Sequence, residues 1–187
     1  MNGFARFWGH LTTITRHRHR VIAHCAKAGI LWQGLLHDLS KYTPTEFLPG
    51  VRFFDGTHSP TEDERRTLGY SQAWMHHKGR NRHHWEYWTD YSIEAGAYLP
   101  VPMPRCYLAE MLCDRIAASK IYKGAAYTDE CPLLYLTNGK LRDRMHPQTL
   151  ALLTRFLTQL RDEGEAAMFA SLRQWVREEA QRGRVGA

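Results

Sequence analysis

Apolar residues recur at the spacing of an α-helix through most of the chain. In residues 5–28 they stand at Phe7, Leu11, Ile14, Val21, Ile22, Cys25 and Ala28. Gly29 follows at a position typical of a helix stop. A second, short helix is expected from about Leu31 to Lys41, and it would carry the adjacent pair His37 and Asp38.

Two further helix starts share one signature. The stretches TPTE (43–46) and SPTE (59–62) each have the form of an N-cap, a proline at the first helical position and a capping-box glutamate. The second start predicts a helix that reaches toward Trp74 and the histidine doublet that follows it.

Glycine and proline punctuate residues 78–104, which predicts an irregular segment. Three later helices are expected, with a loop after the first of them: about Pro104–Tyr122, Pro147–Asp162 and Glu165 to about Gln181. No stretch shows convincing strand alternation, and the tail of about 182–187 is expected to fray. The prediction is an all-α protein whose residues 1–187 form a single helical bundle domain.

Composition agrees with a folded chain of this kind. Hydrophobic residues make up 43% and aromatic residues 12%, which argues against disorder. No apolar run is long enough to span a bilayer, and no signal-peptide core precedes residue 17, so no membrane association and a cytoplasmic location are expected. The four cysteines are scattered, which favours reduced thiols over a zinc site: Cys25, Cys106, Cys113 and Cys131.

The net charge of +6 favours an anionic partner, either a small phosphorylated molecule or a nucleic acid. The basic residues are spread through the chain, however, and no clear nucleic-acid-binding motif is present. A small phosphorylated substrate is therefore the expected partner. The closing helices carry enough apolar residues to pack against the domain or against a second subunit, so a homo-oligomer stays open.

Several polar residues fall on faces that are otherwise apolar. His10, His17 and His24 are seven residues apart and share a helical stripe with Ile14 and Val21. His17 is the best placed of the three to point inward, although a single core histidine is more often a structural hydrogen-bonding group than a ligand.

Asp114 falls on or beside the apolar side of the helix expected at 104–122. A carboxylate there needs a cation, strong donors or a metal, and Arg115 is one position away and cannot face it. An interhelical ion pair is the simpler alternative. Taken with His37 and Asp38, however, His17 and Asp114 supply the mixed nitrogen and oxygen donors of a divalent metal site.

The order His…His-Asp…Asp on an all-α chain resembles the HD-domain superfamily, largely metal-dependent phosphohydrolases. The resemblance implies metal ligands at His17, His37, Asp38 and Asp114, and HDLSK (37–41) matches the frequent HDxxK form, which includes Lys41. The gap between the first two histidines is shorter than is usual, so His10 is the alternative first ligand. QGLLHDLSKYTPTEF, AWMHHKGRNRHHWEYW and EMLCDRIAASKIYKG together resemble an uncharacterised bacterial family of unknown function.

The stretch HHKGRNRHH (76–84) extends this hypothesis. Many HD-domain proteins carry extra histidines that bind a second metal, which implies a second metal or substrate contact here from His76, His77, His83 and His84. The cations of the same stretch, which suit a phosphate, are Lys78, Arg80 and Arg82. The plainer interpretation is an exposed basic loop. Glu86 and Glu110 are possible acid or base groups.

These features predict a phosphohydrolase that uses one or two divalent ions (Mn, Fe, Co, Zn or Mg) to activate water, with a nucleotide or other small phosphorylated metabolite as substrate. Asp38 would act as the base that orients the water, and Lys41 would assist. One alternative is the di-iron oxygen chemistry of some HD-domain proteins. The other is a non-enzymatic helical module in which these polar residues form a structural network.

Overall fold

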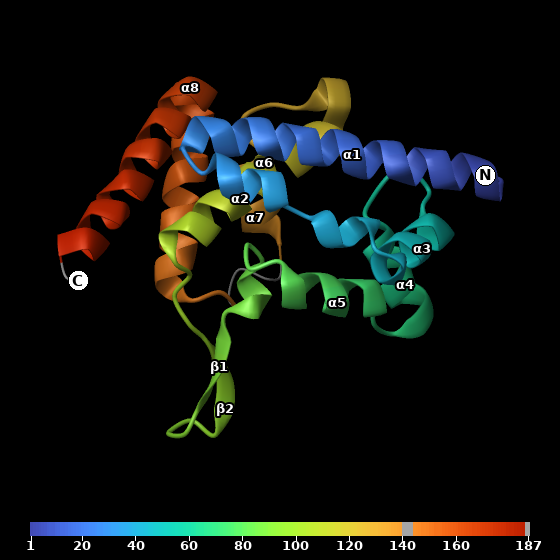
Figure 1. Ribbon diagram of the computed structural model, residues 1–187, viewed down its shortest axis with the longest axis horizontal. Helices are drawn as coiled ribbons and strands as arrows, with labels where there is room; N and C mark the ends of the chain where they lie inside the picture. Colours follow the sequence, from blue (N-terminus) through green and yellow to red (C-terminus); the bar gives the residue numbers. More distant parts are fainter. Residues whose placement is uncertain (140–143, 186–187) are drawn as a thin grey trace.

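A computed structural model gives the structure of residues 1–139 and 144–185, with side chains described as far as residue 178. Its α-helices are α1 (Gly3–Ala28), α2 (Leu31–Leu36), α3 (Pro44–Phe53), α4 (Pro60–Leu68), α5 (Gln72–Arg80), α6 (Arg105–Lys123), α7 (Cys131–Asn138) and α8 (Pro147–Val185). Three 3₁₀ turns join them: η1 (Leu39–Tyr42), η2 (Trp85–Tyr87) and η3 (Gly124–Ala126). The all-α prediction is confirmed (Figure 1).

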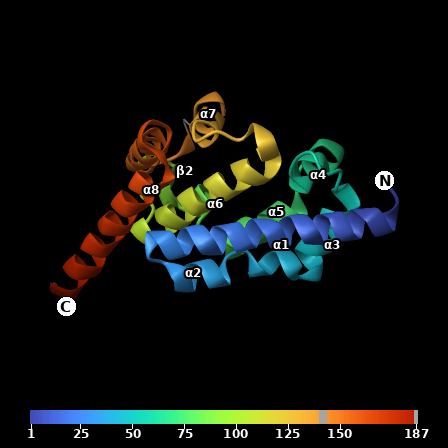
Figure 2. The ribbon, with the colours of Figure 1, turned by 90° about the horizontal axis from the view of Figure 1, so that it is seen from above.

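The core lies between α1, α6 and the two arms of α8. Helices α1 and α6 run side by side, and α2 covers the other flank of α1 (Figure 2). Fully buried side chains from the three long helices fill the space between them: Val21, Cys25, Leu108, Leu112, Ile116, Leu153, Phe156, Leu160, Met168 and Leu172. Burial of these aliphatic and aromatic groups is the main force that holds the bundle together.

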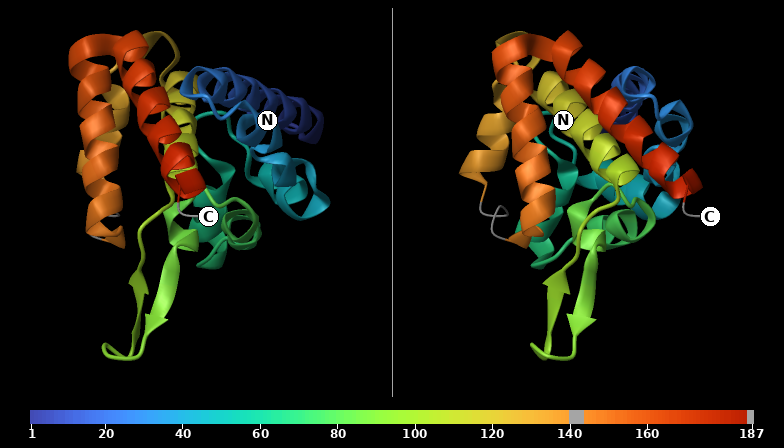
Figure 3. Two further views of the ribbon diagram at one scale, coloured as in Figure 1. Left: turned by 60° about the vertical axis from the view of Figure 1, so that its left-hand side comes forward. Right: turned by 90° about the vertical axis from the view of Figure 1, so that its left-hand side faces the viewer.

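Helix α8 is broken at Gly164, whose φ of 82° and ψ of 173° are not helical. Its two arms therefore fold back on each other, as Figure 3 shows. The break falls between the two closing helices that the sequence predicts. The tail predicted to fray from residue 182 is helical as far as Val185, and residues 186–187 lie outside the described residues.

The helix predicted for Leu31–Lys41 begins at Leu31 as expected, but its extension through His37 and Asp38 is wrong. Helix α2 ends at Leu36, His37 adopts an extended conformation, and Asp38 has a left-handed φ of 55° before η1 begins. This turn points His37 and Asp38 into the protein, where both are almost fully buried at 1% and 2% exposure. An uninterrupted helix would have placed these neighbours about 100° apart around its axis.

Other segments also differ from the prediction. The helix expected from residue 60 to Trp74 is two helices, α4 and α5, because Gly69 ends the first in a left-handed conformation. The loop expected after α6 contains α7, which buries Pro132, Leu133 and Leu136. Within residues 1–139 and 144–185, no helix is long and apolar enough to cross a membrane.

The segment predicted to be irregular contains an antiparallel hairpin of β1 (Thr89–Ser92) and β2 (Ala97–Pro100). The hairpin projects away from the helices in Figure 1, and most of its residues are exposed. Because neither face is buried, its sequence lacks the alternation of apolar and polar residues by which strands are predicted.

Candidate metal centre

Four side chains from three parts of the chain meet beside α1. Helix α1 provides His17, the turn after α2 provides His37 and Asp38, and α6 provides Asp114; one donor atom from each lies within 4.8 Å of the others. His17 Nε2 is 2.9 Å from Asp114 Oδ1, and His37 Nε2 is 3.2 Å from Asp38 Oδ2. We call these four residues the first donor set, and they are the four that the sequence predicts as metal ligands.

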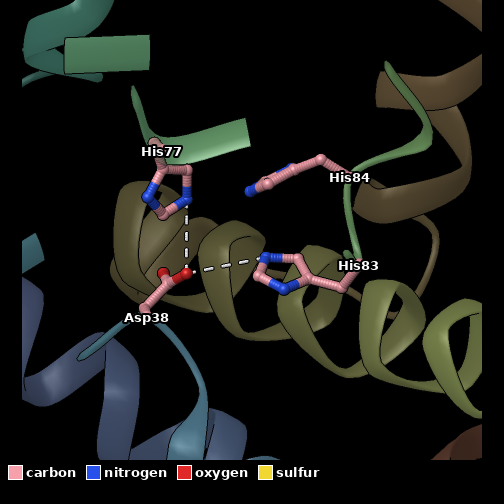
Figure 4. Close-up of side chains that lie close together, drawn as sticks. All are labelled: Asp38, His77, His83 and His84. Carbon is pink, nitrogen blue, oxygen red and sulfur yellow. Dashed lines mark ion pairs between the residues drawn. The ribbon is translucent and has the colours of Figure 1, made fainter. Parts of the chain in front are cut away.

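A second donor set shares Asp38 and consists of Asp38, His77, His83 and His84, again with donor atoms within 4.8 Å. His77 comes from α5 and the other two histidines from the loop that follows it. Asp38 Oδ1 lies 3.3 Å from His77 Nε2 and 3.6 Å from His83 Nε2, and Figure 4 shows the three rings around this carboxylate. Asp38 thus turns one oxygen to each set. Together the seven residues form what we call the histidine–aspartate centre.

The backbone at Asp38 is strained. Asp38 is the one non-glycine residue with positive φ in the described part of the chain. This conformation costs an L-residue about 1 kcal/mol or more, although aspartate tolerates it better than most. The strain persists where the surrounding structure enforces it, and here it sets the carboxylate between two groups of histidines.

The clearest feature of the centre is a set of buried polar atoms that have no hydrogen-bond partner among the described residues, although some of them lie within ion-pair distance of one another or of Lys41. They are His17 Nε2, His37 Nε2, Asp38 Oδ1, Asp38 Oδ2, His83 Nε2 and His84 Nε2. A buried polar atom without a hydrogen bond costs on the order of 1–3 kcal/mol, although the ion pairs of His17 with Asp114 and of Lys41 with Asp38 offset part of this cost. A divalent cation accepts electron pairs from all of these atom types, so these groups could hold a metal ion.

The outer nitrogens of two rings are held by one carboxylate. Glu110 Oε1 lies 2.8 Å from His37 Nδ1 and 3.0 Å from His83 Nδ1. Glu110 precedes Asp114 by one helical turn on α6, so both face the centre. When Nδ1–H of a histidine donates to a carboxylate, the lone pair of Nε2 is free for a metal. Glu110, which the sequence indicates only as a possible acid or base, therefore orients two candidate ligands.

Glu46 plays the same part for a second histidine pair. Its carboxylate lies 2.7 Å from His77 Nδ1 and 2.6 Å from His76 Nδ1. The capping box predicted at 43–46 is wrong, because Thr43 makes no side-chain cap hydrogen bond and Glu46 is buried. His76 pairs with Glu46 and belongs to neither donor set. Of these two histidines, only His77 places a ring nitrogen in the centre.

The charges of the centre suit a cation. Burial alone would lower the pKa of His37, but Asp38, Glu110 and Asp114 together raise this pKa to about 10. The pKa of Asp38 is lowered despite its burial, because His37, Lys41 and His77 face it. A divalent ion would displace the protons that these carboxylates hold on the histidines. Burial lowers the pKa of His84, which leaves its ring neutral, as a ligand must be.

Lys41 is the cation that contacts the centre directly. Its Nζ lies 2.5 Å from Asp38 Oδ2. Burial opposes the charge of this ammonium, but Asp38 and Asp114 raise its pKa above the usual range, so it stays protonated. The sequence indicates Lys41 only through its match to the HDxxK form, and the ion pair with Asp38 is formed across the first turn of η1, which Asp38 precedes.

The other predicted cations lie farther out. Arg82 is exposed, and its guanidinium lies over the rings of Tyr87 and Tyr107, 5.5 and 6.0 Å from their centroids. Lys78 is half-buried and Arg80 is exposed. Among the described residues, no ion pair or hydrogen bond joins any of these three cations to the two donor sets. Their role in substrate binding stays a prediction.

The alternative first ligand, His10, lies elsewhere. Its ring packs against Phe47 and Phe54, with centroids 5.3 and 5.8 Å apart, and it fits against Gly50, where a Cβ would come within 2.2 Å of His10 Nε2. Burial lowers the pKa of His10 to about 4. His10 belongs to neither donor set, and His17 is the residue of this helical stripe that faces the aspartates.

Comparison with known proteins gives a family but no activity. Residues 6–159 match the model of a family of unknown function (DUF5662), so the chain belongs to this family. The match covers α1 to the first arm of α8 and includes every residue of the two donor sets. Neither a curated protein nor a solved structure matches the chain.

Proposed function

We propose that this protein is a metal-dependent phosphohydrolase that acts on a nucleotide or another small phosphorylated metabolite. One observation supports the metal site: six buried nitrogen and oxygen atoms of five side chains converge around Asp38 without a hydrogen bond to a described residue. A structural network would pair such atoms, because each one left alone weakens the fold. A metal ion is the partner that suits all of them.

The donor atoms favour a first-row metal ion, and the two donor sets could hold two such ions. The first set offers two imidazoles and two carboxylates, and the second offers three imidazoles with Asp38 in common. Imidazole suits Zn, Fe, Co or Mn better than Mg, which prefers oxygen alone. A shared carboxylate is a common way to hold two ions a few ångströms apart, an arrangement that serves phosphate-ester hydrolysis. We therefore expect up to two ions per chain.

Such ions lower the pKa of water toward neutrality and stabilise negative charge on a phosphoryl group. In the proposed reaction the oxygen of a water molecule would bond to phosphorus as the ester bond breaks, Asp38 would pass the proton of this water to solvent, and the leaving oxygen would take a proton from solvent. Lys41 holds a phosphoryl oxygen beside Asp38 Oδ2, from which it is 2.5 Å away. Glu46 and Glu110 keep the ring nitrogens of His77, His37 and His83 directed inward.

A second candidate is oxygen chemistry at a pair of iron ions. What supports it is the number of imidazoles: the two donor sets contain five histidines and only two carboxylates. Imidazole is a good ligand for iron, and histidine-rich sites with open positions occur in iron oxygenases. Lys41 and the positive charge of the chain favour a phosphorylated substrate, so hydrolysis remains the first proposal.

The test is to purify the protein without chelators and measure its metals by elemental mass spectrometry. Hydrolysis of p-nitrophenyl phosphate and of a nucleotide panel is then assayed after reconstitution with Mn, Co, Zn or Fe. We expect one or two ions per chain and a metal-dependent phosphatase rate. Asp38→Ala should lose both, whereas Asp162→Ala, an exposed aspartate on α8, should keep both.

Two results would change the conclusion. Two iron ions with oxygen uptake and no phosphatase rate would move the protein to the oxygenase class. A folded wild type that binds no metal under any of these conditions would exclude both activities and leave the centre as a structural network.

A further inference from the structure

Helix α2 carries its apolar residues on the outside. It lies at the edge of the molecule beside α1, as Figure 2 shows. Four of its six residues are large, apolar and exposed: Trp32 is 79% exposed, Leu36 65%, Leu31 48% and Leu35 37%. We call these four side chains the α2 face. A surface helix normally turns such residues to the core and its polar residues to solvent, and α2 reverses this order.

The inner side of α2 is small and polar. Gly34 packs so closely on α1 that a Cβ there would come within 2.5 Å of Cys25 Cβ. Gln33 Nε2 donates to Glu110 Oε2, 2.5 Å away, and Arg18 of α1 donates to two carbonyl oxygens at the C-terminal end of α2. These contacts fix the helix and leave its apolar side chains turned outward. A face that is already rigid binds a partner at a lower cost in entropy.

The α2 face is large enough to form the apolar part of a stable interface. With about 200 Å² for one fully exposed large side chain, the four exposed fractions correspond to roughly 450 Å². A stable interface buries about 800 Å² on each partner, of which about 450–520 Å² is apolar. An apolar patch of roughly 450 Å² is also in the size range of the largest patches on monomeric proteins, which are often functional.

The chemistry of this face favours a second copy of the same chain as its partner. Helix α2 contains no charged residue, and Arg18, the cation that contacts it, is bound to its carbonyl oxygens. A two-fold interface brings the same patch of both protomers together, so an uncharged patch meets itself without like-charge repulsion. An anionic membrane surface instead attracts helices whose polar face carries lysine or arginine, and α2 has neither.

We propose that the α2 face is the interface of a homodimer, in which Trp32 and Leu36 of each protomer pack against the same face of the other. Tryptophan is enriched among the residues that contribute most to binding, so Trp32 is the expected anchor. The closing helices, which the sequence leaves open as a subunit contact, bury their large apolar residues in the core of the protomer. This proposal does not depend on the proposed hydrolase activity.

The test is sedimentation velocity of the full chain from about 0.1 to 100 µM, because interfaces of standard size reach Kd values in the micromolar range. We expect a monomer–dimer equilibrium. The double variant Trp32→Glu, Leu36→Glu should weaken the dimer at least about 100-fold, since each new charge is buried twice and meets its own copy. The matched control, Leu134→Glu with Tyr135→Glu, alters two exposed apolar residues of α7 and should change the equilibrium less than about twofold.

Hydrogen exchange locates the interface in the wild type without any substitution. Amides of residues 30–39 should exchange more slowly at about 100 µM than at about 1 µM, because the dimer covers α2 and slows its local opening. Amides of the hairpin should exchange at the same rate at both concentrations. Equal rates for residues 30–39 in a protein that dimerises would place the interface elsewhere and overturn the proposal.

Two further results would also overturn it. One is a wild type that stays monomeric over the whole range, and the other is a dimer that the double variant leaves intact. If a monomeric wild type binds phospholipid vesicles and the double variant does not, the α2 face is a membrane-binding surface instead. The double variant should keep the circular-dichroism spectrum and metal content of wild type, because the substituted side chains are exposed. If it does not fold, the exchange rates of the wild type decide.

Discussion

Helix α1 contributes to two polar clusters, and in only one of them does every charged group have a partner. His17 belongs to the histidine–aspartate centre, where six buried atoms have no hydrogen-bond partner among the described residues. Two turns later, His24 and Lys27 belong to a cluster around Glu165 at the start of the second arm of α8. We call the latter, which also includes Lys120, the Glu165 cluster.

The Glu165 cluster pairs its own charges. Glu165 accepts from Lys27, 2.5 Å away, and from Lys120 through its other oxygen. His24 Nδ1 lies 3.2 Å from the carbonyl oxygen of Cys113. Burial works against the charge of Glu165, but the two lysines and His24 lower its pKa to about 2. A structural network joins helices by satisfying every member, and this cluster does so for α1, α6 and α8.

In the histidine–aspartate centre, the hydrogen-bonded ring nitrogens are those that point away from Asp38. Glu46 and Glu110 bind the outer nitrogens of three of its rings, while the inner nitrogens of His37 and His83 and both oxygens of Asp38 make no hydrogen bond to a described residue. An arrangement that satisfies the outer atoms and leaves the inner ones open is expected of a binding site. The contrast predicts that a ligand of the histidine–aspartate centre raises the stability of the protein. It also predicts that acidification or loss of a partner in the Glu165 cluster lowers this stability.

The largest effect of a single binding event should come from adding metal to metal-free protein. At a free metal concentration a thousand times the Kd, binding stabilises the native state by about 4 kcal/mol. For a chain of this size that is roughly a 10 °C rise in Tm, measurable by calorimetry. Asp38→Ala should abolish the rise because both donor sets include this residue. Glu165→Gln should keep it, and an unchanged rise in Asp38→Ala would contradict the assignment of the centre.

The next effect is a loss of stability on acidification that involves the structural histidines of α1. Burial lowers the pKa of His10 and of His24 to about 4 in each case. An unfolded histidine titrates near 6.5, so the unfolded state binds more protons between pH 6.5 and about 4. The contribution of these two histidines to stability is therefore complete above pH 6.5 and falls as the pH decreases to 4, by roughly 3 kcal/mol per histidine.

Urea unfolding of chelator-treated protein from pH 7.5 to 4 measures this dependence. The double variant His10→Gln, His24→Gln should have a shallower slope than wild type. His19→Gln, on the exposed side of the same helix, is the control and should not alter the slope. Equal slopes for the double variant and wild type would mean that neither buried ring controls acid stability.

The smallest loss of stability is expected when the Glu165 cluster loses its carboxylate. Glu165→Gln leaves Lys120, 18% exposed, without its carboxylate, and should cost about 1–3 kcal/mol. Glu163→Gln, two residues earlier on an exposed position of α8, should cost less than about 0.5 kcal/mol. Chemical denaturation of the two variants gives both values. A Glu165→Gln variant as stable as Glu163→Gln would show that the cluster does not hold the helices together.

Much of the fold could be predicted because it depends on periodicity within single helices. The apolar spacing in residues 5–28 and in 104–122 identifies α1 and α6 and shows which faces are buried. The hairpin and the left-handed turn at Asp38 could not be predicted in this way. The hairpin buries neither face, and the turn is held by contacts with distant helices.

The candidate site shows the same division. Helical spacing places His10, His17 and His24 on one inward stripe, and all three are indeed buried. Their surroundings differ because each meets a different partner: the rings of Phe47 and Phe54, the aspartates, or the carbonyl of Cys113. Nothing in the spacing of seven distinguishes among these partners, because they come from segments far away in the chain.

The sequence alone therefore determined the all-α class, since helical periodicity is a local feature. It also indicated His17, His37, Asp38 and Asp114 as candidate metal ligands, because the His-Asp dipeptide and the helical faces can be recognised locally. The tertiary structure decided the rest. It brought the second donor set to Asp38 and made Glu46 an orienting carboxylate in place of a helix cap. The physical reason is that pairing of buried polar groups depends on side chains from separate helices, whose meeting is decided only when the whole core packs.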